Sequence, residues 1–175
     1  MTCICAIHAG GVTWIGSDQR SVVGNGTPFD CGPKWTIGKY GAIATAGPIM
    51  FSAIVERHKR LLVDQVNDEH TLSTALRDLA KGADCHPQDK DRYFPDYGFE
   101  GIYATRSGVW VISDSLAFEK ASDFWAAGSG GAVARGAYWA CAHLHEPSAC
   151  MALAIEAACN LDIYCGGPPW VHRLE

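Results

Sequence analysis

Thr2 is the residue of this chain best placed to do chemistry, because it directly follows Met1. If Met1 is removed, Thr2 carries a hydroxyl and a free α-amine on one residue, so a nucleophile and a general base are paired without a histidine. An α-amine titrates near pH ~7.7–8.0 and is therefore partly unprotonated at neutral pH. A threonine after methionine is also an ordinary way for a chain to start, so the rest of the sequence has to decide between the two interpretations.

The composition is that of a single globular domain spanning residues 1–175, with 48% hydrophobic and 19% charged residues. A formal charge of -5 and scattered lysines and arginines argue against a nucleic-acid partner. The longest uncharged apolar stretch, residues 40–55, is interrupted by glycine and proline and is too short to cross a bilayer. With no basic region ahead of an apolar one at the start, the sequence predicts a cytoplasmic protein without membrane association.

The cysteines and histidines do not form a recognisable metal motif. The chain lacks a Cys-x-x-Cys pair, and His143 and His145 are two positions apart, so they would diverge on a helix. In a reducing cytosol most cysteines are expected to be small buried hydrophobic residues. We therefore expect no metal, no cofactor and no disulfide framework.

Alternating short apolar runs and helical periods indicate the elements that must position Thr2. Gly10 and Gly11 predict a tight hairpin, and apolar residues follow helical spacing from Pro48 and again from Thr71. The expected strands are 2–8, 11–17, 34–37, 41–46, 101–105, 109–112, 124–127 and 170–174; the expected helices begin at 48 and 71 and span 131–145 and 147–161; residues 84–98 are expected to be a loop. This order predicts two sheets between helical layers.

Residues 128–131 (GSGG) lie between an expected strand and an expected helix, where a phosphate could bind. No Lys-Ser or Lys-Thr follows, and Val133 stands where a dinucleotide fingerprint needs glycine. The segment is better interpreted as a tight turn at a helix start, with Ser129 as the capping hydroxyl.

Six blocks in order, spread over nearly the whole chain, resemble proteasome β-type subunits of the small bacterial, HslV-like kind. The pattern is closest to that of the betaproteobacterial proteasome homologue. The blocks are Thr2, residues 16–20 (GSDQR), Lys34, residues 45–47 (TAG), residues 127–131 (AGSGG) and residues 162–167 (DIYCGG).

The resemblance implies an α+β fold, the four-layer αββα sandwich of N-terminal nucleophile (Ntn) hydrolases. It also implies a threonine endopeptidase that hydrolyses unfolded polypeptides inside a homo-oligomeric double ring of 12 or 14 subunits. An AAA+ ATPase is a candidate partner. Neither a metal nor a cofactor is implied.

The family's functional residues map onto matching positions of this sequence. The resemblance implies that Thr2 is the nucleophile, that Lys34 lowers the pKa of its hydroxyl and amine, and that Asp18 holds the lysine ammonium. It also implies the N–H of Gly47 as the oxyanion donor. The remaining implied residues are Ser129 and Asp162 near the Thr2 amine, Arg20 and Cys165 in support, and Ser21, Thr45, Ile49 and Ala53 in the substrate pocket, whose small and aliphatic members suggest an apolar preference.

The sequence departs from the family pattern at two positions, and two alternative functions stay open. Cys165 replaces the family's serine with a weaker donor, and the position of Asp162 does not favour an HslU-type ATPase partner. If Met1 is retained, the chain would be a catalytically silent ring or scaffold subunit. If the protein is an open monomer or dimer, an amidase of the same fold acting on small molecules is the alternative.

Overall fold

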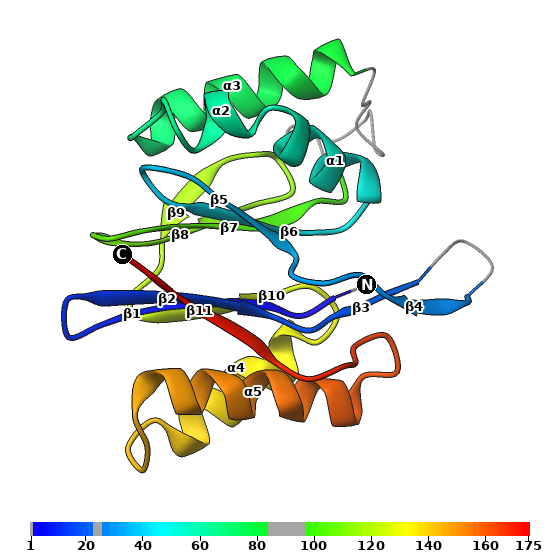
Figure 1. Cartoon of the computed structure of the whole chain (residues 1–175), viewed down its shortest axis with the longest axis vertical. Helices are drawn as coiled ribbons and strands as arrows, with labels where there is room; N and C mark the ends of the chain where they lie inside the picture. Colours follow the sequence, from blue (N-terminus) through cyan, green and yellow to red (C-terminus); the bar gives the residue numbers. More distant parts are fainter. Residues whose placement is uncertain (1, 23–25, 84–96) are drawn as a thin grey trace.

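The computed structural model describes residues 2–22, 26–83 and 97–175. Within them, two main antiparallel sheets pack face to face, and helices cover the outer side of each (Figure 1). The layers therefore run helix, sheet, sheet, helix, which confirms the αββα architecture. Most of the expected loop 84–98 lies outside the described residues. In the described part of the chain, no helix has the length and apolarity needed to cross a membrane.

The first sheet has the strand order β10-β1-β2-β11 and holds both ends of the described chain. Its strands are β1 (Ile4–Ala9), β2 (Val12–Ser17), β10 (Phe124–Ala127) and β11 (Trp170–Leu174). The predicted hairpin between β1 and β2 is confirmed: Gly10 (φ 58°) and Gly11 (φ 75°) form its two-residue turn, and both need a left-handed backbone that favours glycine.

The second sheet has the order β5-β6-β7-β8-β9. Its strands are β5 (Trp35–Ile37), β6 (Ala42–Ala46), β7 (Glu100–Thr105), β8 (Gly108–Ile112) and β9 (Phe118–Lys120), and a separate two-stranded ribbon joins β3 (Arg20–Val22) to β4 (Pro28–Asp30). Strands β3, β4 and β9, each of three residues, were not expected from the sequence, whereas the equally short β5 was expected within 34–37.

Three helices cover the outer face of the second sheet: α1 (Ile49–Arg57), α2 (Lys59–Leu62) and α3 (Glu69–Gly82) (Figure 1). The expected single helix after Pro48 divides at His58, which ends α1. Asp68 begins α3 by accepting a hydrogen bond from the Thr71 N–H at 2.8 Å. Phe51, Leu72, Leu76 and other buried residues of this layer pack on Ile43.

Two helices cover the outer face of the first sheet: α4 (Gly131–Cys141) and α5 (Pro147–Leu161) (Figure 1). Helix α4 ends four residues earlier than expected. The Cys150 thiol donates to the Cys141 carbonyl at 3.1 Å, and the Leu144 N–H donates to the same oxygen at 2.9 Å, so the last turn closes instead of continuing.

The space between the sheets is filled mainly by small and β-branched side chains. In β6, the alanines at 42, 44 and 46 face this inner core, while Ile43 faces the helices, as a period of two requires. In β1, Ile4 and Ala6 face the inner core. Cys5 and Ile7, together with Cys3 just before the strand, face α5 on the outer side. The start of the chain is thereby held at the end of both sheets, where the candidate site forms.

Candidate active site

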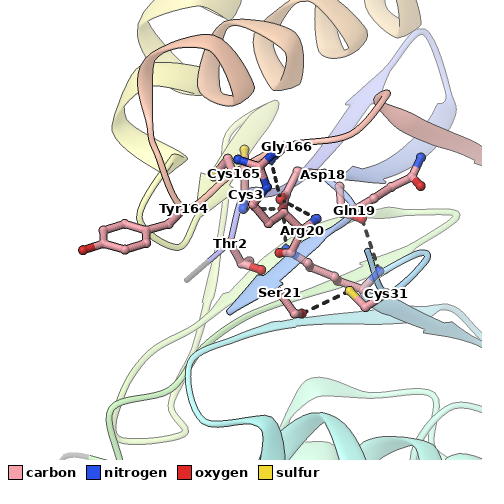
Figure 2. A network of polar contacts seen from close by, with 12 residues as sticks. Thr2, Cys3, Asp18, Gln19, Arg20, Ser21, Cys31, Tyr164, Cys165 and Gly166 are labelled. Atoms are coloured by element: carbon pink, nitrogen blue, oxygen red, sulfur yellow. Dashed lines mark hydrogen bonds and ion pairs between the residues drawn. The ribbon is translucent and has the colours of Figure 1, made fainter. Parts of the chain in front are cut away.

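Asp18 is the centre of the polar network at this end of the first sheet (Figure 2). Its side chain follows β2 and is fully buried. One carboxylate oxygen accepts the Cys3 N–H at 2.8 Å, and the other accepts the Arg20 N–H at 3.0 Å and the Gly166 N–H at 3.1 Å. Three segments that are distant in sequence are therefore joined by one carboxylate.

Lys34 completes this network with a charge. Its Nζ lies 2.6 Å from Asp18 Oδ1, and the lysine side chain is only 7% exposed. The same Nζ donates to the Arg20 carbonyl. A buried ion pair is stable only when further hydrogen bonds satisfy both partners, and here the backbone supplies them. The structure thus brings together two predicted site residues, Asp18 and Lys34.

Thr2 is 5% exposed and lies against the turn that precedes α4. Its backbone N is 3.1 Å from Ser129 Oγ, and its carbonyl accepts the Gly130 N–H at 3.2 Å. Gly128 (φ 84°) allows this approach, because a Cβ there would lie 2.2 Å from the Thr2 carbonyl oxygen. Ser129 does not cap α4: the helix has Gly130 at its N-cap and no side-chain cap, so that interpretation was wrong.

Asp162 lies behind Ser129, immediately after α5. Its carboxylate accepts the Tyr164 N–H at 3.0 Å and the Cys165 thiol at 3.4 Å. Partial burial tends to raise the pKa of Asp162, but hydrogen bonds from Ser129, Tyr164 and Cys165 outweigh it and the net pKa is lowered. An ionised carboxylate is therefore linked through the Ser129 hydroxyl to the backbone nitrogen of Thr2.

Arg20 and Cys165 pack around this network rather than inside the cavity. The Arg20 guanidinium lies over Gly166, where a Cβ would meet its atoms at 2.4 to 2.5 Å, and donates to the Ile163 carbonyl at 3.4 Å. Burial raises the pKa of the Cys165 thiol. A hydrogen bond with Cys5, together with burial, raises the pKa of the Cys3 thiol. Both thiols are fully buried, and their raised pKa favours the neutral form, so neither is a reactive thiolate.

A cavity of about 680 Å³ opens beside Thr2, between the β3–β4 ribbon, β5, β6 and α1. Lys34 and the expected pocket residues Ser21, Thr45 and Ile49 line it. Ala53 does not line the cavity. The face of α1 that lines it carries Ser52 and Glu56, and Ala53 lies outside this face.

Gly47 lies on the cavity wall between β6 and α1. Its φ is 118°, and a Cβ would lie 2.4 Å from the Gly98 carbonyl oxygen, so only glycine fits here without strain. The backbone hydrogen bonds among the described residues include none from the Gly47 N–H.

Sequence reasoning missed several lining residues, among them Cys31, Thr36, Ser52 and Glu56. The helical spacing of Ile49, Ser52 and Glu56 could have indicated a shared face, had the start of α1 been known. No group of three or more His, Cys, Asp or Glu side chains suited to a metal ion was found among the described residues.

Neither a protein-family model nor a curated protein sequence matches the chain. Solved structures do. Thiobacillus denitrificans BPH in complex with epoxomicin aligns with a TM-score of 0.83 and 18% identity, covering 99% of this chain and 98% of that chain. A second structure of T. denitrificans BPH gives the same TM-score and identity. HslV from Trypanosoma brucei aligns with a TM-score of 0.70 and 16% identity over 99% of both chains.

These likenesses define the class of fold: the chain has the four-layer Ntn-hydrolase fold. More particularly, it has the proteasome β-type fold of BPH and HslV over its full length, which confirms the resemblance inferred from the six sequence blocks.

Proposed function

We propose that this chain is a threonine-type peptidase subunit that hydrolyses peptide bonds of unfolded polypeptides through Thr2. The observation that carries the proposal is the pair of polar networks that flank Thr2 at the cavity. The Asp18–Lys34 ion pair lies on one side, and Ser129 with Asp162 lies at the Thr2 nitrogen.

In this mechanism, removal of Met1 frees the Thr2 amine, which takes the proton of the Thr2 hydroxyl as the oxygen attacks the substrate carbonyl. The Lys34 ammonium, fixed by Asp18, favours the developing alkoxide electrostatically. The Gly47 N–H stabilises the oxyanion of the tetrahedral intermediate. Collapse releases the amine half of the substrate and leaves an ester on Thr2, which water activated by the amine then hydrolyses.

Ser129 and Asp162 orient the amine in this scheme. The hydroxyl stands 3.1 Å from the Thr2 nitrogen, and the lowered pKa of Asp162 keeps an anion behind it at neutral pH. A proton held by the amine in the tetrahedral intermediate is thereby stabilised before it passes to the leaving nitrogen.

We also propose that the subunit acts in the cytoplasm within a closed double ring of 12 or 14 copies, with an AAA+ ATPase as a candidate partner. Large apolar side chains support an interface on the α4–α5 side: Trp139 is 82%, Leu161 75% and Ile163 78% exposed. Native mass spectrometry tests the assembly. A single-chain mass at all concentrations, together with cleavage of a small amide, would favour the amidase alternative.

The decisive experiment is intact mass spectrometry with an epoxyketone probe. Wild-type protein should have lost Met1 and gain one probe mass on Thr2, whereas Thr2→Ala should gain none and cleave no peptide. Cys3→Ser is the matched control and should label as the wild type does, since the Cys3 thiol is buried and neutral. Retained Met1 without labelling would support the silent ring subunit, and labelling of Thr2→Ala would refute Thr2 as the nucleophile.

A further inference from the structure

The cavity beside Thr2 has an apolar floor and two charged residues on its wall. Phe29 (41% exposed) and Ile49 (72% exposed) provide accessible apolar lining, above the buried side chains of Ile43 and Val55. Lys34 and Glu56 are the two charged residues among those that line it. Because the Lys34 ammonium is already paired with Asp18 at 2.6 Å, its charge is balanced within the protein. The charge that the cavity offers to a ligand is therefore the carboxylate of Glu56.

Glu56 is held in place from the opposite wall. The Thr36 hydroxyl, on β5 and only 7% exposed, donates to Glu56 Oε2 at 2.6 Å. This bond uses one oxygen and leaves Oε1 as an acceptor. Among the described residues, no cationic side chain lies within ion-pair distance of Glu56. The carboxylate is thus oriented by the protein but not neutralised by it.

A second polar pair lies on the same wall. The hydroxyls of Thr45 and Ser52 are 2.6 Å apart, and both residues line the cavity. Their oxygens retain lone pairs that accept further N–H donors. A cavity with apolar walls, one oriented carboxylate and spare hydroxyl acceptors suits a side chain with an apolar stem and a cationic, donor-rich head.

We propose that this cavity receives the side chain that precedes the cleaved bond and selects lysine or arginine there, with Glu56 as the specificity-determining residue. The proposal rests on the proposed peptidase function, because Thr2 and Glu56 line one cavity. The stem packs on accessible apolar side chains such as Phe29 and Ile49, while the ammonium or guanidinium meets Glu56. An acidic side chain is excluded by like charge. This proposal differs from the apolar preference that the sequence suggested from Thr45, Ile49 and Ala53. The structure places Glu56 in the cavity lining and leaves Ala53 out of it.

A set of fluorogenic peptides that differ only in the residue before the fluorophore tests this, with Arg, Leu or Glu at that position. Because Glu56 is exposed in the free subunit, solvent screens its charge, and wild-type kcat/KM should favour Arg over Leu by about 2–5-fold. Glu56→Gln keeps the shape and an acceptor for Thr36, and should bring the Arg-to-Leu ratio close to one. Glu56→Lys should move the preference towards the Glu peptide.

Glu156→Gln is the matched control, because it neutralises an exposed glutamate on α5 in the opposite helical layer. It should leave the Arg-to-Leu ratio as in the wild type. A wild-type preference for Leu, or an unchanged ratio in Glu56→Gln, would overturn the specificity role while leaving the peptidase function standing. Absence of both peptide cleavage and epoxyketone labelling in the wild type would overturn the peptidase function and this inference with it.

Discussion

Replacing Asp18 by asparagine should destabilise the protein strongly although the side chains have nearly the same shape. The aspartate accepts hydrogen bonds on both sides: Cys3 and Lys34 on one oxygen, Arg20 and Gly166 on the other. An asparagine amide has one acceptor oxygen and one NH2 group. In either orientation, the NH2 group faces donors, and the Lys34 ammonium loses its anion.

The magnitude follows from the burial of the pair. Asp18 is fully buried and the Lys34 side chain 7% exposed, so solvent screens the lost interaction very little. Breaking a buried pair on one side costs about 3–5 kcal/mol. For a domain of this size, each kcal/mol shifts Tm by about 2–4 °C, so Asp18→Asn should lower Tm by ~6–20 °C.

Differential scanning calorimetry at fixed protein concentration measures this shift. Asp64→Asn is the control, because Asp64 accepts a single exposed hydrogen bond from the Lys39 N–H, and its loss should cost less than about 1 kcal/mol. The double variant Asp18→Asn/Lys34→Met should regain part of the lost stability, since it removes the orphaned ammonium. A Tm for Asp18→Asn within ~2 °C of the wild type would refute the account of Asp18 as the buried centre of the site.

Two further predictions concern the cavity and the Asp162 carboxylate. Cys31 is exposed and lines the cavity, so a bulky maleimide should alkylate it and block peptide cleavage. The Cys31→Ser variant should keep its activity under the same treatment. Equal inhibition of the wild type and the variant would show that another cysteine is responsible. The pKa of Asp162 is lowered on folding, so its contribution to stability is present above the ordinary value of ~3.9 and is lost as the pH falls below it. The Tm of the wild type should therefore fall more steeply than that of Asp162→Asn as the pH is lowered from ~4 to ~2, and parallel curves would contradict the lowered pKa.

Local signals predicted the elements that carry the site well. Gly10 and Gly11 alone indicate the β1–β2 hairpin, because two consecutive left-handed residues are needed there. The helical spacing after Thr71 likewise predicted α3, with the start two residues late, because the capping role of Asp68 depends on backbone geometry. Both signals act over a few residues, which is why a single sequence reveals them.

The interior of the site was harder to predict because its bonds join distant segments. The family resemblance predicted Asp18 and Lys34 as a pair. It did not predict the hydrogen bond from the Gly166 N–H to Asp18, two residues that are 148 positions apart. Glu56 was missed as a cavity residue because its position depends on how α1 packs against β5, where the Thr36 hydroxyl donates to it. The local pattern at Ser129 indicated only a helix start, and its place near the Thr2 nitrogen came from the family resemblance, because the contact joins residues 127 positions apart.

The strand order β10-β1-β2-β11 also dictates when a functional site can exist during synthesis. The β1–β2 hairpin emerges from the ribosome early, yet both of its neighbours in the sheet belong to the last third of the chain, as do Ser129, Asp162 and Gly166. At ~5–20 residues per second, the hairpin waits several seconds for partners that complete its hydrogen bonds. Over that interval, Asp18 has no hydrogen bond from the Gly166 N–H, and the Thr2 nitrogen has no contact with the Ser129 hydroxyl. If Thr2 is the nucleophile that we propose, a nascent chain has no organised nucleophile until its last third has folded.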